Sequence, residues 1–240
     1  MGTLDSATDW LDLASVDSAV FALRPDYRAL LIVAEQLVPG ESDVVSEALL
    51  ADAETLISTR LEDQPLDEFP ELLAWREAYR AFGSKPQRFR PSVEALVRRV
   101  GDGLPRIDRI TDTYNAISVA HLLPLGGEDA DRYSGAARLF RADGSESFEL
   151  MSSGERVVEH PEPGEVVWGD DDGVTCRRWN WRQSLRTRIT GETTRALFIL
   201  DSLAEVTPHD RLAAAGAALR EGLAAFSPEA TFTSRMIEPA

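Results

Sequence analysis

The stretch ARLFRADGSESFELMSSGERVVEHPEPGEVVW, residues 137–168, decides the predicted fold of this 240-residue chain. Short runs of β-prone residues alternate in it with turn signals such as Asp143-Gly144. This alternation is typical of antiparallel strands joined by tight turns. The same texture continues to Trp181, so the sequence predicts an antiparallel β meander that begins near Gly135.

Helical periodicity precedes this meander. Apolar residues recur there at the spacing of one helix face, between residues that favour helix starts and stops. Four helices are predicted, over residues 42–61, 67–82 and 93–100 and from Asp108 or Thr111 to residue 123. Residues 84–92 hold two prolines and are expected to form an extended basic connector, because the residue before a proline avoids helical geometry.

The two ends of the chain add further elements. Residues 19–23 and 28–38 are apolar and β-prone, and predict a hairpin around the Arg24-Pro-Asp26 turn. Residues 195–203 predict another strand. Thr207-Pro-His-Asp210 is a helix start signal for the alanine-rich run to Phe226, and the tail beyond Pro228 is expected to be loosely held.

These elements predict an α+β protein, in which helices pack on an antiparallel sheet to form a single compact unit. We expect residues 1–84 to be a supporting α/β segment of that globule. Residues 85–204 are expected to form the module that holds the functional residues, and residues 205–240 a C-terminal helix and tail.

Charge is unevenly distributed along the chain. The formal net charge is −16, which argues against non-specific binding to nucleic acid or anionic lipid. Residues 85–110 hold 7 basic and 3 acidic side chains, and residues 174–190 hold 5 arginines and no acid. These two basic islands are solvated faces or parts of a binding site.

Composition also points to a compartment. The N-terminal residues lack the pattern of a secretory signal, and the longest apolar stretches fall far short of the roughly 20 residues of a membrane span. Cys176 is the single cysteine, which fits a reducing compartment. We expect a cytoplasmic protein with no membrane partner; the sequence leaves the oligomeric state open.

Several chemistries lack their motifs. The three histidines and one cysteine show no ligand spacing, so no metal site is expected. The phosphate-binding and dinucleotide-binding glycine motifs are missing, so no cofactor is expected either. Nucleophilic catalysis would depend on Cys176, which is expected to face the core of a strand, and no Gly-x-Ser-x-Gly elbow occurs.

The most unusual segment is CRRWNWRQS, residues 176–184. As a strand it would direct Arg178, Asn180 and Arg182 to one side, and Trp179, Trp181 and Gln183 to the other. Such a set can orient a carboxylate, a phosphate or an ester. The alternative is an exposed polar face above tryptophans in the core. Asp112-Thr-Tyr-Asn115, at the start of a predicted helix, is a second candidate, with helix capping or a surface role as its alternative.

Three segments resemble the B3/B4 domain of the phenylalanyl-tRNA synthetase β subunit. They are residues 104–117, 123–131 and 191–198. The free-standing B3/4-domain proteins are similar as well, through Phe89-Arg-Pro-Ser92 and Arg177-Arg-Trp-Asn-Trp-Arg-Gln-Ser184. The resemblance covers about residues 85–204. This chain has Gly126 and Gly127 where the synthetase carries a histidine, and no acid near residues 183–185 where it carries a glutamate.

The resemblance implies hydrolysis of the ester of a mischarged aminoacyl-tRNA, because that domain is the editing site of the synthetase. It implies tRNA or aminoacyl-tRNA as the partner. Non-catalytic binding of RNA or of an aminoacyl ligand, or a repurposed small-molecule site, stay open as alternatives. A positioned water with donors around the oxyanion can suffice for such an ester. The candidate catalytic residues are Asn115, Asn180 and Arg182, and the candidate substrate-binding residues are Asp112, Tyr114, Arg178, Trp179, Trp181, Gln183 and Arg186.

Overall fold

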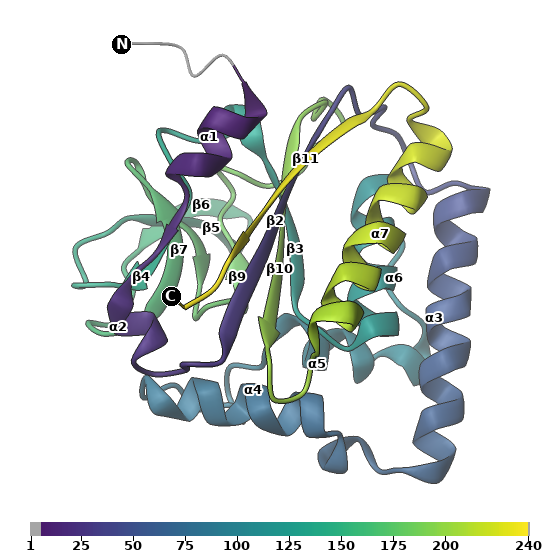
Figure 1. Ribbon diagram of the computed structural model, residues 1–240, viewed down its shortest axis with the longest axis horizontal. Helices are drawn as coiled ribbons and strands as arrows, with labels where there is room; N and C mark the ends of the chain where they lie inside the picture. Colours follow the sequence, from purple (N-terminus) through teal and green to yellow (C-terminus); the bar gives the residue numbers. More distant parts are fainter. Residues whose placement is uncertain (1–5, 240) are drawn as a thin grey trace.

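A computed structural model describes residues 6–239, which form three layers (Figure 1). The middle layer is a four-stranded antiparallel sheet in the order β11-β2-β10-β3. Its strands are β2 (Tyr27–Glu35), β3 (Leu125–Asp129), β10 (Ala196–Leu203) and β11 (Thr231–Ile237). Helices cover one face of this sheet and a second sheet covers the other, which confirms the predicted α+β class.

Both faces of the middle sheet are buried because its central strands are apolar at nearly every position. Along β2, Leu31 packs toward the second sheet, whereas Ile32 packs toward the helices. The same alternation continues on β10, where Ile199 pairs with Leu31 and Phe198 with Ile32. A strand with two apolar faces lies inside a protein rather than at its surface.

Three helices form the layer on one side: α3 (Val44–Asp63), α6 (Arg109–His121) and α7 (His209–Phe226). In this layer α6 lies between the sheet and α3, so that it packs on both sides. The side chain of Asp108 accepts a hydrogen bond from Thr111 N and begins α6, as predicted. Ten consecutive residues of α6, from Ile110 to Val119, are therefore buried.

The second sheet is the predicted meander, in the order β1-β4-β7-β8-β9 with a separate β5–β6 hairpin. The strands of the second sheet are β1 (Ser15–Val16), β4 (Arg138–Arg141), β7 (Val166–Asp170), β8 (Gly173–Arg177) and β9 (Arg182–Gln183). The hairpin consists of β5 (Phe148–Ser152) and β6 (Glu155–Glu159). Pairing is antiparallel except between β1 and β4. The meander prediction is confirmed, and the parallel β1 strand is an addition to it.

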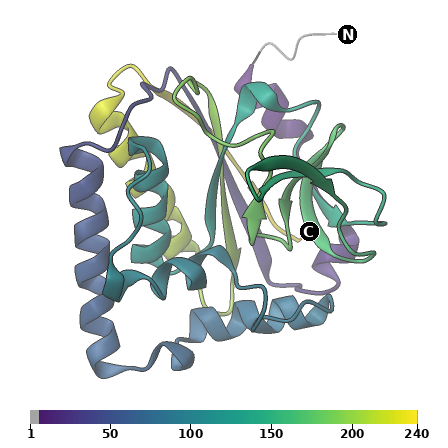
Figure 2. The same cartoon turned by 180° about the vertical axis from the view of Figure 1, so that it is seen from behind.

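Four shorter helices complete the described part: α1 (Ala7–Leu13), α2 (Ser18–Phe21), α4 (Pro70–Ala81) and α5 (Ser92–Val97). Helix α4 runs along the lower edge of Figure 1 and joins the helix layer to the second sheet. From behind, residues around α5 lie near the foot of the middle sheet (Figure 2). Short 3-10 turns occur at Leu66–Glu68, Val100–Asp102 and Ala130–Arg132.

Three local predictions in the N-terminal half of the chain are wrong. The strand predicted over residues 19–23 does not form: residues 18–21 are helix α2, because Asp17 caps a helical turn by accepting from Ala19 N at 3.2 Å. The expected hairpin around residues 24–26 therefore does not form. The basic connector is also not extended, since Arg88 N and Phe89 N both donate to Lys85 O and fold it into a turn.

Two strands of the middle sheet were not predicted. Residues 125–129 form β3 at one edge of the middle sheet, and the supposedly loose tail forms β11 at the other edge. Residues 1–84, 85–204 and 205–240 thus all contribute strands to the middle sheet. Helix α7 begins as predicted near Pro208, but without a side-chain cap from Thr207.

Candidate functional site

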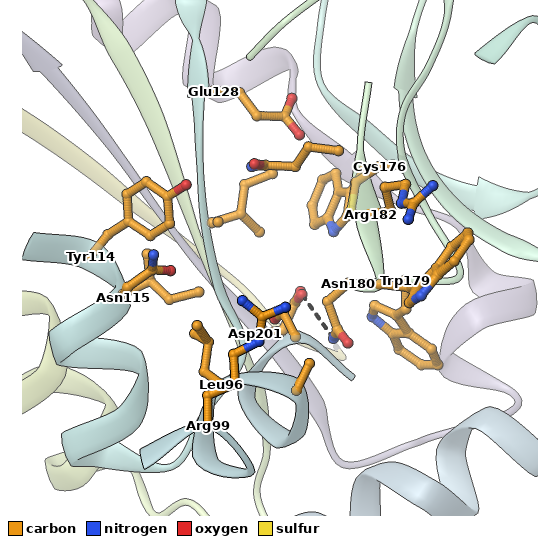
Figure 3. Close-up of a pocket in the computed structure, with 18 residues that line it drawn as sticks. Leu96, Arg99, Tyr114, Asn115, Glu128, Cys176, Trp179, Asn180, Arg182 and Asp201 are labelled. Carbon is orange, nitrogen blue, oxygen red and sulfur yellow. Dashed lines mark hydrogen bonds between the residues drawn. The ribbon is translucent and has the colours of Figure 1, made fainter. Parts of the chain in front are cut away.

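A cavity of about 240 Å³ lies where α5, α6, the edge strand β3 and the turn before β9 meet (Figure 3). Tyr114 and Asn115 reach it from α6, and Leu96 and Arg99 from α5 and its C-terminal end. The opposite wall is formed by the second sheet and the 179–183 segment. Of the sequence candidates, the cavity brings together Asn115, Asn180, Arg182, Tyr114, Trp179, Trp181 and Gln183.

Two buried carboxylates also line this cavity. Glu128 on β3 is 1% exposed and Asp201 on β10 is 2% exposed. Burial raises the pKa of each carboxyl group to about 7, because removal from water disfavours the charged form. Neither has an arginine, lysine or histidine partner within 4 Å in residues 6–239. A carboxyl group with a pKa near neutrality can exchange protons under physiological conditions.

Glu128 is held by hydroxyl groups. The hydroxyl of Tyr133 donates a hydrogen bond to it and also lies 3.4 Å from Thr175 Oγ1. This hydroxyl favours the charged carboxylate, but burial has the larger effect on the pKa. Figure 3 shows Glu128 on the side of the cavity opposite Leu96 and Arg99.

Asp201 on β10 and Asn180 in the turn before β9 form a hydrogen-bonded pair that lines the cavity. Asn180 Nδ2 donates to Asp201 at 3.2 Å, as drawn in Figure 3. The hydroxyl of Tyr27 donates to the second oxygen of Asp201 at 2.6 Å, and that of Tyr79 donates to Asn180 Oδ1 at 2.9 Å. Both tyrosines come from the first 84 residues of the chain. The pair is therefore fixed in one orientation, with one amide N–H of Asn180 left over.

Asn115 is positioned differently. Its side chain is 8% exposed, lines the cavity and makes no hydrogen bond to another side chain or backbone group of residues 6–239. Its neighbour Tyr114 packs against Phe198 of the middle sheet. The amide of Asn115 is therefore the donor on this wall that an incoming carbonyl oxygen can use.

The segment 176–184, called the Arg-Trp segment below, turns at residues 178–181 between β8 and β9 instead of forming one strand, which corrects the predicted alternation of its side chains. Arg178 and Trp179 have positive φ angles of 47° and 67°. The turn buries Trp179 against Tyr27 and Trp75, with ring centroids 5.0 Å and 5.5 Å apart. Asn180 and Trp179 therefore both line the cavity, although a strand would separate them.

The rim of the cavity is basic and partly closed. Gln183 Nε2 donates to Gly127 O at 2.9 Å and so ties β9 to β3. Arg182 is exposed and its guanidinium lies 4.8 Å from the ring of the half-buried Trp181. Arg99 is exposed on the α5 side. Among the described residues, neither arginine forms an ion pair.

Three predicted substrate-binding residues lie outside the cavity. Asp112 faces the start of α6, where it accepts from Ser42 Oγ and Ile107 N at 2.5 and 2.8 Å. Arg186 is paired with Asp170 at 2.6 Å. Arg178 contacts Glu165 and lies over Phe89, on the far side of the turn. Their placement follows from ion pairs and caps that the sequence pattern does not specify.

Cys176 lies in β8 and is buried, as expected. Burial raises the pKa of its thiol far above the ordinary value, so the thiolate is disfavoured and the group is a poor nucleophile. Sequence reasoning missed Glu128, Asp201 and Arg99. Only Asp201 carried a signal, since it is the single acid inside the apolar run of β10.

Within residues 6–239, no group of three or more His, Cys, Asp or Glu side chains is arranged to hold a metal ion. In the same part of the chain, no helix has the length and apolar character required to cross a membrane.

Comparison with known families gives the class of protein. Residues 74–212 match the family model of the B3/4 domain, so this chain belongs to the B3/4 domain family. No curated protein matches the chain. Among solved structures, it is similar to an N-terminal fragment of the phenylalanyl-tRNA synthetase β subunit from Pyrococcus horikoshii, with 12% identity and a TM-score of 0.46. That alignment covers 94% of this chain and 54% of the fragment, so the chain spans about half of the fragment's length.

Proposed function

We propose that this protein hydrolyses the ester bond of a mischarged aminoacyl-tRNA in trans, with Glu128 as the general base. The observation that carries the proposal is a cavity containing two buried carboxylates, each with a pKa of about 7 and no cationic partner among residues 6–239. Perturbed carboxyl groups in a cavity are typical of acid–base sites. The resemblance to the editing domain supports an aminoacyl ester as the substrate.

The cavity residues divide the chemical work. Glu128 removes a proton from a water molecule as that water attacks the ester carbonyl, and returns the proton to the ribose oxygen when the ester C–O bond breaks. The amide of Asn115 donates to the carbonyl oxygen as negative charge develops there. Asn180, fixed by Asp201 and Tyr79, supplies a second N–H. Arg182 and Arg99 at the rim attract the phosphates of the tRNA end.

A deacylation screen tests this proposal. The purified protein is mixed with a panel of correctly and incorrectly charged tRNAs, and release of free amino acid is measured. At least one mischarged tRNA should be cleaved, and Glu128→Gln should lower that rate by roughly 10²–10⁴-fold. The exposed Glu192→Gln is the matched control and should cleave normally. A folded wild-type protein that cleaves no member of the panel contradicts the proposal.

Non-catalytic binding of an aminoacyl ligand is the second candidate. It is favoured by the closed network of Tyr27, Asp201, Asn180 and Tyr79, because a rigid polar wall suits selective binding as well as catalysis. A non-hydrolysable aminoacyl-adenosine amide distinguishes the two. Tight binding of that amide without turnover of any ester supports the binding role.

A further inference from the structure

Two further hollows lie next to each other, and one of them borders the cavity. The first has a volume of about 450 Å³ and is lined by Ser84, Lys85, Arg88 and Phe89 on one side and by Glu162, Glu165 and Arg178 on the other. The second, of about 400 Å³, shares Arg88, Phe89, Glu162 and Arg178 with the first. It shares Trp181 and Arg182 with the cavity. We call this continuous surface the arginine groove.

The arginine groove has an excess of positive charge in an acidic chain. Its lining holds five cations, Lys85, Arg88, Arg177, Arg178 and Arg182, against three acids, Glu159, Glu162 and Glu165. Arg177 pairs with Glu165 and Glu159, at 2.9 and 3.0 Å. Lys85, Arg88 and Arg182 are exposed and have no carboxylate partner in residues 6–239. These three cations are available to an anionic ligand.

Aromatic rings hold the guanidinium groups in place. The Arg178 guanidinium carbon lies 3.6 Å from the centroid of Phe89 and 4.7 Å from that of Trp181. Arg88 lies 5.1 Å from Phe89, and Arg182 4.8 Å from Trp181. A stacked guanidinium keeps its N–H edge in a fixed direction, which suits bidentate contact with phosphate oxygens.

Arg178 shows two features of a ligand site. Its backbone has a positive φ of 47° in a residue other than glycine, and such strain clusters at binding sites. The residue is 8% exposed, and its Nη1 atom has no hydrogen-bond partner among the described residues. Ser84 Oγ, in the same lining, is also buried and unpartnered. Buried unsatisfied polar groups are uncommon in folded proteins.

We propose that the arginine groove binds consecutive phosphates of a single-stranded RNA. A free phosphate ion would occupy one hollow, whereas this surface offers two hollows in series with unpartnered cations along both. The groove also ends at Trp181 and Arg182, which line the cavity. Entry of the RNA 3′ end into the cavity rests on the proposed function. Binding of the phosphates in the groove does not.

The double variant Lys85→Gln, Arg88→Gln tests the groove. Binding of a fluorescein-labelled 12-nucleotide RNA is measured by anisotropy at several salt concentrations. We expect the variant to bind about tenfold more weakly, with a salt slope smaller by about 1.4, since each phosphate contact on a single strand contributes about 0.7. The matched control is Arg132→Gln, an exposed arginine outside both hollows, which should bind as the wild type does.

A labelling experiment uses the fact that Lys85 is the only lysine in the chain. An amine-reactive acetylating reagent followed by peptide mass spectrometry reports Lys85 separately from the N-terminal amine. The RNA should protect Lys85 several-fold, and inorganic phosphate or adenosine monophosphate at the same concentration should not. Equal protection by inorganic phosphate would assign the groove to free phosphate and overturn the RNA proposal.

Hydrolysis of a small aminoacyl ester separates this inference from the proposed function. Neither Lys85 nor Arg88 lines the cavity, so the double variant should hydrolyse an amino-acid ethyl ester at the wild-type rate. If no ester is hydrolysed but RNA binding still depends on these two cations, the proposed function fails and the groove stands. If the wild type does not bind the RNA, or the double variant binds it equally well, the groove proposal is wrong.

Discussion

This protein contains two kinds of buried carboxylate. In the second sheet, Glu165 is 3% exposed and is bound by the guanidinium of Arg177 through two hydrogen bonds of 2.9 Å. In the cavity, Glu128 and Asp201 are equally buried but contact hydroxyl and amide groups instead. In the first arrangement the arginine neutralises the carboxylate charge. In the second no cation among residues 6–239 does so, and the carboxyl groups have pKa values of about 7.

Three other buried acids follow the first arrangement. Glu71, Glu94 and Asp170 are buried, and each is paired with at least one arginine. Although burial opposes it, arginine contacts hold the pKa of Glu71 and of Glu94 below the ordinary value. Asp112 and Asp129 are held by backbone N–H groups and hydroxyls near helix starts. Buried acids outside the cavity are thus held by arginines or by donors near helix starts, whereas within residues 6–239 the two cavity acids contact only side-chain hydroxyl and amide groups.

Breaking the paired arrangement should have the largest effect on stability. In Arg177→Met, Glu165 would remain buried without its main partner, so we expect the free energy of unfolding to fall by about 3–5 kcal/mol. Urea denaturation at pH 7 measures this loss. The exposed Arg182→Met is the matched control and should change stability by less than about 0.5 kcal/mol. A small loss in Arg177→Met would mean that the pair does not neutralise Glu165.

The unpaired arrangement should appear as a pH dependence of stability. The folded protein holds the Asp201 proton up to a pKa of about 7, whereas the unfolded chain releases it near the ordinary value of 3.8. Stability is therefore lost as pH rises from about 4 to 7, by roughly 4 kcal/mol at 1.36 kcal/mol for each pH unit. Asp201→Asn should remove this contribution and leave the slope that Glu128, with its own pKa of about 7, adds over nearly the same range. An unchanged pH profile in that variant would show that Asp201 is ionised in the folded protein at low pH.

The hydroxyl contacts of the cavity pair predict a smaller effect. Tyr27→Phe removes a donor to the Asp201 carboxylate, so it should cost about 1.5–3 kcal/mol where that group is charged, above pH 7. Below pH 5 the cost should be smaller, because the pKa of Asp201 rises further when the donor is lost. Tyr79→Phe is the control, since its partner is the neutral Asn180. Its cost, measured by the same denaturation series, should not vary with pH.

The smallest expected effect is that of the cysteine. Cys176 is buried in β8 and burial raises the pKa of its thiol, so an acyl-enzyme through sulfur is not expected. Cys176→Ala should therefore leave single-turnover deacylation within about twofold of the wild type. Trapping of a thioester on Cys176, or loss of activity in the variant, would contradict a mechanism through activated water.

Local signals predicted helices α3 to α7 and the meander, but not α1 or α2. Asp108 caps α6, and turn residues separate the strands of the second sheet. Strand β3 was missed because two glycines disfavour a strand locally. It forms because β10 pairs with it, and Gly127 suits it because a Cβ atom there would come within 2.9 Å of Tyr114 and Phe198. A side chain such as histidine at that position would require these packed side chains to shift.

The candidate site was predictable only in part. The unusual Arg-Trp segment and the start of α6 drew attention to Asn115 and Asn180, which the fold brings to one cavity. Glu128 was one of 41 acids in the sequence, and only its burial without a cation distinguishes it. Arg178 was misplaced because a left-handed turn, rather than a strand, follows β8. Burial and turn handedness both depend on tertiary contacts that no local pattern encodes.

The pH dependence of single-turnover deacylation tests the central claim most directly. With a charged tRNA that the wild type cleaves, the rate should rise about tenfold for each pH unit below 7 and level off above it, because Glu128 acts as a base only when deprotonated. Glu128→Gln should lose most of the rate together with this inflection. A wild-type rate that does not change between pH 5 and pH 8, or a Glu128→Gln protein with the wild-type profile, would contradict the account.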